Sequence, residues 1–229
     1  MNFLLIPGAG GEAWVWSRVE SELIARGHAA ASIELPADDE SCGIKEYAER
    51  ALSTVEDGTN PLVVGLSLGA FTAASVCLEI ETTSLTFVNG MIPLPGETPG
   101  EWWEATGQPT AKAANDVRDG RDPEAPFDPL TTFFHDVPAE VAVEAEYHNR
   151  MQSSGPFTSS WALPRWPDVP IHVVIGRGGC DHLMRPRRDH QIWPHVALGN
   201  GGVHRFVTRG LEPGTHGEEV EGGTVRGDP

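Results

Sequence analysis

The sequence predicts an α/β fold, in which a mostly parallel sheet is flanked by helices and carries a cap-like insertion. Within the first 90 residues, short apolar runs alternate with segments whose apolar residues recur every three or four positions. One of these runs leads into a Gly-x-Ser-x-Gly turn at residues 65–69. The alternation stops at about residue 91, and an apolar run of the same kind returns at 171–175. Strands and helices in this order form parallel sheets with crossover helices on both faces.

The predicted elements of the first 90 residues follow in regular order: strand 3–6, helix 14–26, strand 29–35, helix 44–55, strand 61–66, helix 68–80 and strand 85–88. The first strand is an unbroken apolar run that ends at Pro7-Gly8, which is typical of a strand buried on both faces. Gly27 is placed to cap the first helix at its C-terminus, and Pro36 ends the second strand. The first helix has an apolar face formed by Trp14, Val15, Val19, Leu23 and Ile24.

The later part of the chain predicts a division into core, insertion and tail. Residues 1–90 and 171–210 are expected to form the core, and 91–170 an insertion over the C-terminal edge of the sheet, where α/β proteins bind ligands. An irregular part of the same globule is the alternative. Within the insertion, 137–151 predicts a helix and the remainder irregular structure. Residues 211–229 are Gly-rich and polar, which indicates disorder.

Charge and hydrophobic pattern indicate which binding partners and which cellular location to expect. The formal net charge of −17 repels phosphate groups, so neither nucleic acid nor an anionic membrane is an expected partner. The expected partner is a small-molecule substrate. No apolar stretch is long enough to span a membrane, and the apolar N-terminal run is too short for a signal peptide, which favours a cytoplasmic location. The sequence leaves open whether the chain forms a homo-oligomer.

The cysteines and histidines indicate no metal site. Cys42, Cys77 and Cys180 lie far apart without a CxxC pair, so neither a disulfide framework nor a cysteine zinc site is expected. No His-Glu-x-x-His motif occurs, and the histidines are dispersed. Cys77 lies in an apolar helical stretch, which is typical of a core thiol.

The turn Gly65-Leu66-Ser67-Leu68-Gly69 predicts a nucleophilic serine. It follows a predicted strand and precedes a predicted helix, which is the setting that a nucleophile elbow requires. The serine of such an elbow has a strained backbone, and the flanking glycines allow strand and helix to approach closely. An ordinary serine in a Gly-containing turn is the alternative.

A serine nucleophile also needs two backbone amides for the developing oxyanion. The predicted donors are Leu68, directly after the serine, and Ala9, in the Gly-rich loop that follows the first strand. The same loop could hold a phosphate, but it does not fit Gly-x-x-x-x-Gly-Lys-Ser/Thr and is a poor match to Gly-x-Gly-x-x-Gly. Nucleotide binding is therefore not expected.

Residues 3–16, with the sequence Phe-Leu-Leu-Ile-Pro-Gly-Ala-Gly-Gly-Glu-Ala-Trp-Val-Trp, resemble the opening of α/β-hydrolases in the plant methylesterase and hydroxynitrile lyase group. That group has a strand, a His-Gly turn and a Gly-Ala-Trp-x-Trp helix start in this order, and Pro7 stands here in the usual place of the histidine. The turn at 65–69 follows at the expected distance, so the resemblance covers residues 1–90. It implies an α/β-hydrolase fold and a cofactor-free enzyme for esters or related carbonyl compounds, although some relatives cleave or form C–C bonds.

The resemblance also implies an acid and a base that follow the serine along the chain. Asp181, in the loop after the strand at 171–175, is the predicted acid, although that loop is longer than in relatives. His204 follows Gly-Gly-Val, similar to the Gly-Gly-x-His loop that presents the base in many relatives, and His216 is the second candidate. The catalytic triad predicted from the sequence is thus Ser67, Asp181 and His204.

Hydrolysis of a small or medium-sized ester, thioester or lactone through an acyl-enzyme on Ser67 is the function that the sequence favours. Relatives follow the base with an apolar final helix that residues 207–229 do not predict. That departure motivates the alternative of a binding or auxiliary protein with an impaired triad. A lyase or cyclase on the same scaffold is the third hypothesis. Five aromatic residues of the insertion either line the substrate pocket or form its core: Trp102, Trp103, Phe133, Phe134 and Trp161.

Overall fold

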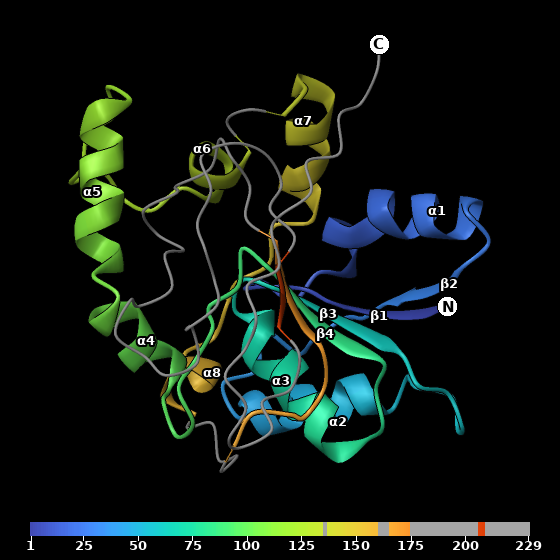
Figure 1. Ribbon diagram of the computed structural model, residues 1–229. Helices are drawn as coiled ribbons and strands as arrows, with labels where there is room; N and C mark the ends of the chain where they lie inside the picture. The colour runs from blue at the N-terminus through green and yellow to red at the C-terminus, as the bar shows by residue number, and fades with distance from the viewer. Residues whose placement is uncertain (135–136, 160–164, 175–205, 209–229) are drawn as a thin grey trace.

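A computed structural model of the chain describes residues 1–134, 137–159, 165–174 and 206–208, in which a six-stranded sheet is the central layer (Figure 1). The strands are β1 (Asn2–Ile6), β2 (Ala29–Ser32), β3 (Leu62–Leu66), β4 (Ser84–Val88), β5 (Ile171–Val174) and β6 (Phe206–Thr208). Their order across the sheet is β2-β1-β3-β4-β5-β6, and β1 to β5 are parallel. Only the pair β5 and β6 is antiparallel among them. The predicted mostly parallel α/β sheet is therefore confirmed.

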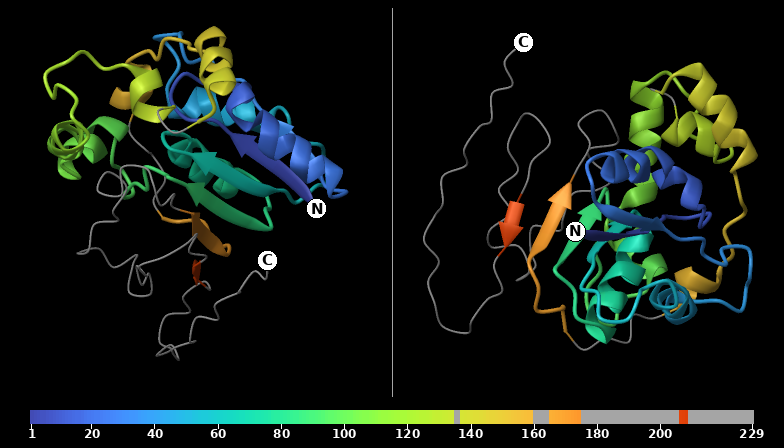
Figure 2. Two further views of the ribbon diagram at one scale, coloured as in Figure 1. Left: turned by 90° about the horizontal axis from the view of Figure 1, so that it is seen from above. Right: turned by 90° about the vertical axis from the view of Figure 1, so that its right-hand side faces the viewer.

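Helices lie on both faces of the sheet, as the two views of Figure 2 also show. The 3-10 helix η1 (Ala13–Trp16) and α1 (Ser17–Ala25) lie on one face, and α2 (Ile44–Leu52) and α3 (Gly69–Glu79) lie together on the other. Successive side chains of a strand point to opposite faces. Leu4 and Ile6 accordingly join the large core under α2 and α3, whereas Leu5 packs with Trp16 under η1.

The helix α3 is the most deeply buried helix of the core. Its residues 69–77 are all buried, including Phe71 with no exposed surface. Because α3 packs against both the sheet and α2, an almost continuous apolar sequence replaces the amphipathic pattern of a surface helix. This burial fixes the N-terminal end of α3, which begins two residues after Ser67.

The apolar face predicted on residues 14–26 is not a buried face. Val15, Val19 and Ile24 are 38%, 43% and 55% exposed, and no residue of α1 is buried. The 3-10 geometry of η1 changes the angular spacing of side chains, since this helix has about three residues per turn. Trp16, which the predicted face omitted, is consequently the side chain that packs on the sheet, together with the partly buried Leu23.

The prediction that residues 91–170 are irregular outside one helix is also wrong. The helix expected at 137–151 is present as α7 (Ala139–Tyr147). Four further helices surround it in sequence: α4 (Pro99–Ala105), α5 (Gln108–Arg118), α6 (Pro129–Phe133) and α8 (Gly155–Thr158). Helix-start signals identify two of them: Thr98 and Glu101 form a capping box at α4, and Asp128 caps α6.

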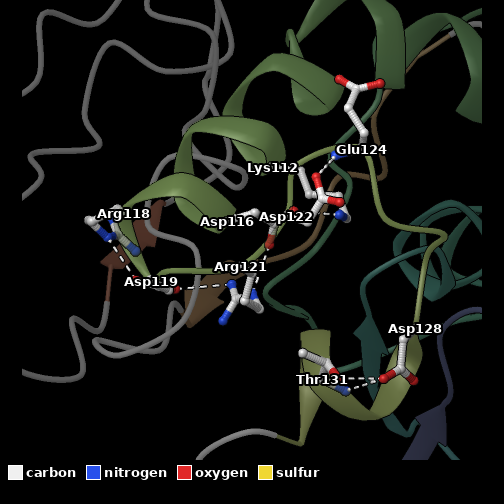
Figure 3. Close-up of polar contacts among 9 residues, drawn as sticks. All are labelled: Lys112, Asp116, Arg118, Asp119, Arg121, Asp122, Glu124, Asp128 and Thr131. Atoms are coloured by element: carbon white, nitrogen blue, oxygen red, sulfur yellow. Dashed lines mark hydrogen bonds and ion pairs between the residues drawn. The ribbon is translucent and has the colours of Figure 1, made fainter.

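The helix α5 lacks an apolar stripe and is held by ion pairs near its C-terminal end (Figure 3). Asp116 Oδ2 lies 2.6 Å from Lys112 Nζ, and Asp116 Oδ1 lies 2.9 Å from Arg121 Nε. Asp119 pairs with Arg118 at 3.1 Å and with Arg121 at 3.0 Å. Such contacts do not produce hydrophobic periodicity, so the sequence pattern could not reveal this helix.

In Figure 1, α4, α5 and α8 lie on the side of the sheet opposite the N-terminus, from which β1 starts. The boundaries of core and insertion at residues 91 and 171 remain predictions, and the tail at 211–229 lies outside the described residues. None of the helices within the described ranges combines the length and the apolar character needed to cross a bilayer.

Candidate active site

The candidate site lies where the strand order reverses. From β1 the chain continues to β2 on one side, then crosses back to β3 on the other side of β1. The loops that follow β1 and β3 therefore diverge from adjacent strands at the carboxyl edge of the sheet. In open parallel sheets this reversal opens a crevice in which ligands bind. The loop at residues 7–11, named here the first-strand loop, and the turn at Ser67 meet at this position.

Ser67 adopts the left-handed backbone conformation, with a φ of 49°. Asn89 is the other residue besides glycine with a positive φ among the described residues. Such a conformation is costly for a residue with a Cβ and persists only where its surroundings impose it. It lies between β3 and α3, so the strand-turn-helix setting expected for a nucleophile elbow is present.

The neighbouring glycines permit the close packing that imposes this turn. A Cβ on Gly65 would lie 2.6 Å from Gly69 O and 2.8 Å from Ala73 Cβ. A Cβ on Gly69 would overlap the carbonyl oxygen of Pro7. Residues with side chains at either position would separate the helix from the strand or from the first-strand loop. The pattern Gly-x-Ser-x-Gly thus has a steric reason at both ends.

Backbone hydrogen bonds hold the serine turn. The amide of Ser67 donates to Val88 O at 3.1 Å, and the carbonyl of Ser67 accepts from Met91 N at 3.0 Å and Ala70 N at 3.1 Å. Because the N–H of a trans peptide points away from its C=O, the Leu68 amide points away from these two donors. Among the described residues, no acceptor binds the amide of Leu68 or of Ala9.

The first-strand loop packs against the serine through Gly8. A Cβ on Gly8 would lie 3.1 Å from Ser67 Cβ and 3.2 Å from Leu66 O. The amide of Gly11 donates to Gly8 O at 3.1 Å, and Gly10 and Gly11 have φ angles of 86° and 69°. Within this tight turn Ala9 is exposed, whereas its two neighbours are buried.

A segment distant in sequence supports the outer side of this loop. The amide of Gly10 donates to Gln152 Oε1 at 3.0 Å. Arg150 forms ion pairs with Glu12 at 3.3 Å, Glu34 at 3.2 Å and Asp38 at 2.8 Å. Sequence analysis missed these residues, because nothing in a local pattern relates residue 152 to residue 10.

The same segment contacts the start of η1 through aromatic rings. The His148 ring stacks on Trp14 with centroids 4.8 Å apart and an interplanar angle of 7°. Trp14 Nε1 donates to Glu144 at 2.8 Å, and His148 Nδ1 lies 3.3 Å from Glu12 Oε2. Residues 144–152 are therefore anchored both beside the first-strand loop and at the helix that follows it.

Of the predicted site residues, Ser67, Leu68 and Ala9 are described, and the first-strand loop lies against the serine turn. Asp181, His204 and the alternative base His216 lie outside the described residues, as does Trp161. Trp102 is 5% exposed, belongs to the large core and donates from Nε1 to Ile92 O at 3.0 Å. Its place is thus in the core.

The other predicted aromatic residues differ in their surroundings. Phe133 is 55% exposed and forms an edge contact with Phe127 at 5.8 Å. Phe134 lies 6.3 Å from Trp14 between ring centroids, and Trp103 packs partly buried against the core. None of the described contacts brings these rings to Ser67.

Both described cysteines have thiol pKa values above the ordinary one. Cys77 is 7% exposed, which confirms the predicted core thiol, and burial raises its pKa to about 12. Partial burial and the nearby Asp39 carboxylate raise the pKa of Cys42. Within the ranges that the structure describes, no cluster of three or more His, Cys, Asp or Glu side chains is arranged to hold a metal ion.

A parallel α/β sheet with a left-handed serine between a buried strand and a buried helix defines the class of α/β-hydrolase folds. A sequence profile described as the Alpha/beta hydrolase family matches residues 3–223, and the chain belongs to this family. A search of curated protein sequences gives no significant match.

Solved structures with the same fold include several esterases. An extracellular α/β-hydrolase from a Paenibacillus species aligns with a TM-score of 0.59 and 17% identity, over 76% of this chain and 77% of that one. A methylesterase from Arabidopsis aligns with 0.55 and 17% identity, over 76% of each chain. A pyrethroid hydrolase from Sphingobium faniae aligns with 0.53 and 19% identity, over 72% and 73%. At these identities the likeness establishes the fold.

Proposed function

We propose that the protein is a serine esterase that cleaves small or medium-sized carboxylic esters through an acyl-enzyme on Ser67. The observation that carries this proposal is the left-handed Ser67 packed against Gly8 of the first-strand loop. A backbone strained at one serine, at the reversal of strand order, is costly unless that serine has a task. Membership of the α/β hydrolase family supports the same conclusion.

In the proposed reaction, Ser67 Oγ attacks the ester carbonyl carbon while His204 accepts the hydroxyl proton. The carbon–oxygen bond to the alcohol then breaks, and the alcohol leaves with that proton. Water, activated by the same histidine, attacks the acyl-enzyme and releases the acid. Asp181 orients the imidazole, and His216 is the alternative base.

The proposed oxyanion hole consists of the amides of Ala9 and Leu68. Both are without an acceptor among the described residues, and both belong to segments whose neighbouring peptides are held by hydrogen bonds. The N-terminus of α3 directs its positive dipole toward the same position. These features favour a negative charge developing on the carbonyl oxygen.

A neutral apolar ester is the proposed substrate class. A strongly anionic substrate would be repelled by the acidic protein, whose net charge is −17. The methylesterase of the same fold is named for ester cleavage, which is the chemistry proposed for this chain, and the pyrethroid hydrolase is named for hydrolysis. No cofactor is required by this mechanism, since nucleophile, base and oxyanion donors all come from the chain.

A series of p-nitrophenyl esters from acetate to octanoate tests the proposal. Hydrolysis is expected for the wild type, with an acyl adduct on Ser67 detected by mass spectrometry after rapid acid quenching. The Ser67→Ala variant is expected to lose the adduct and to retain only residual activity, about 10³-fold or more below the wild type. A Ser53→Ala variant, in a surface turn away from the site, is the matched control. Equal activity in wild type and Ser67→Ala would overturn the proposal.

A further inference from the structure

We propose that Gln152 is a positioning residue that holds the first-strand loop in the orientation required for oxyanion binding. This inference rests on the proposed esterase function, because only a reaction at Ser67 gives the orientation of the Ala9 amide a chemical consequence. It concerns a residue far from residue 10 in sequence, at a contact between the α7–α8 connection and the loop after β1.

The side-chain amide of Gln152 has only one satisfactory orientation. Its Nε2 lies 3.3 Å from Ala37 O and 3.2 Å from Ser153 O, and both of these oxygens only accept hydrogen bonds. Nε2 also donates to the hydroxyl of Tyr47 at 3.1 Å. Because these acceptors fix the nitrogen, the oxygen must face Gly10 N, which only donates.

Gln152 itself is attached firmly to the core. The next residue, Ser153, donates its amide to Ala37 O at 2.7 Å and its hydroxyl to Asp39 O at 3.1 Å. Tyr47, which accepts from Gln152, is 1% exposed within the large core. The Gln152 carboxamide therefore holds the first-strand loop in a fixed position relative to the core.

The hydrogen bond from Gly10 N to Gln152 restrains one of the two peptides on either side of the Ala9 Cα. The Gly8–Ala9 peptide is held by the hydrogen bond from Gly11 N to Gly8 O. The Ala9–Gly10 peptide is held by the hydrogen bond from Gly10 N to Gln152 Oε1. The Ala9 N–H belongs to the first of these peptides, and the bond to Gln152 fixes the second, so the turn that orients the Ala9 N–H is held on both sides.

Without Gln152, the second of these peptides has no described side-chain partner. Gly10 and Gly11 rotate more freely than other residues, so without Gln152 the hydrogen bond from Gly11 N to Gly8 O is more easily broken. The Gly8–Ala9 peptide is then free to turn, which points Gly8 O where the Ala9 N–H is needed. A carbonyl oxygen repels the oxyanion that an N–H stabilises. The loss would therefore affect the transition state more than substrate binding.

The test compares Gln152→Met with Ser154→Ala and the wild type. Methionine keeps the approximate length and volume but forms no such hydrogen bonds, whereas Ser154→Ala removes only the bond from an exposed hydroxyl to Glu40. Removal of a complete oxyanion donor typically costs about 10²- to 10³-fold in kcat, so a misaligned donor is expected to cost about 10- to 100-fold. The KM of Gln152→Met is expected to change less than about threefold, and the kcat of Ser154→Ala to remain within about twofold of the wild type.

A trifluoromethyl ketone supplies a readout specific to the oxyanion, since it adds to a nucleophilic serine as a tetrahedral hemiketal. Its inhibition constant is expected to rise in Gln152→Met by the same factor by which kcat falls. Hydrogen exchange of the amides in residues 8–11 is expected to accelerate in this variant alone. Unchanged kcat and unchanged ketone affinity in Gln152→Met would overturn the proposal, as would equal losses of activity in both variants.

If the proposed esterase function is wrong, these experiments give a different result than if only the positioning role of Gln152 is wrong. If the wild type neither hydrolyses esters nor binds the ketone, the esterase assignment is wrong whatever Gln152 does. If the wild type is active and Gln152→Met is equally active, the esterase assignment stands and the positioning role does not.

Discussion

Gly8 lies directly against Ser67, so close that a Cβ on Gly8 would be 3.1 Å from Ser67 Cβ. The two residues follow adjacent parallel strands, β1 and β3, at the point where the strand order reverses. Their contact brings the first-strand loop beside Ser67. The distance between loop and serine is therefore set by backbone packing, and enlarging Gly8 is expected to change it.

Gly8→Val is expected to reduce ester hydrolysis by about 10- to 100-fold, because a displacement of the loop by a fraction of an ångström misaligns the Ala9 amide. The measurement is kcat for a p-nitrophenyl ester, accompanied by the melting temperature to confirm folding. A folded Gly8→Val protein with the activity of the wild type would show that the loop takes no part in catalysis.

Gly69→Ala is expected to destabilise the fold by about 3 kcal/mol, since its Cβ would overlap the Pro7 carbonyl rather than a movable side chain. Gly58→Ala is the matched control: Gly58 has a φ of 76° but no neighbour within 4 Å of the added Cβ. Only backbone strain opposes that change, so it is expected to cost about 1–2 kcal/mol. Urea unfolding of both variants measures the difference, and equal costs would contradict the steric account.

Cys77 is expected to resist alkylation in the folded protein. With a pKa of about 12 and 7% exposure, its thiolate is scarce and inaccessible at neutral pH. Iodoacetamide at about pH 8 should modify Cys42 before Cys77, as followed by peptide mass spectrometry. In urea the two should react at similar rates. Rapid labelling of Cys77 under native conditions would show that α3 is less firmly packed than described.

Asp116 is expected to stabilise the folded protein at neutral pH but not in acid. Hydrogen bonds from Lys112 and Arg121 hold the pKa of its carboxyl below the ordinary value of 3.8. The unfolded chain therefore takes up this proton first as the pH falls. The stabilisation is complete above the unfolded pKa and is lost as the pH falls through the folded pKa.

The Asp116→Asn variant should accordingly be less stable than the wild type at about pH 7 and nearly equal to it near pH 2. Chemical unfolding at both pH values measures the difference. Asp57→Asn, which removes the same charge from an exposed turn, is expected to change stability little at either pH. A pH-independent difference for Asp116→Asn would show that its ion pairs do not contribute.

The sheet and the serine turn could be predicted from the sequence because their signals are local. Strand-sized apolar runs correspond to β1, β3, β4 and β5 within a residue or two at each end. The glycines around Ser67 mark a place where strand and helix must approach closely, and the structure has this approach. Local chemistry and global fold agree at these positions, as they do in most well-packed cores.

What the sequence could not predict depends on contacts between distant residues or on helix signals other than hydrophobic periodicity. The ion pairs of Asp116 hold α5 without an apolar stripe, and the 3-10 geometry of η1 turns Trp16 toward the sheet. The contact of Gln152 with Gly10 joins residues 142 positions apart, so no local pattern contains it. Strand β6 pairs antiparallel with β5 and has only three residues, too few for a strand signal.

The central claim is that Ser67 is an activated nucleophile, and covalent labelling tests it without knowledge of the substrate. Wild type and Ser67→Ala would each be treated with a fluorophosphonate, digested and mapped by mass spectrometry. A single phosphonyl adduct on Ser67 in the wild type, absent from the Ser67→Ala variant, is the predicted result. Folded wild-type protein without an adduct on Ser67 would contradict the account and favour a hydrolase fold that serves only to bind.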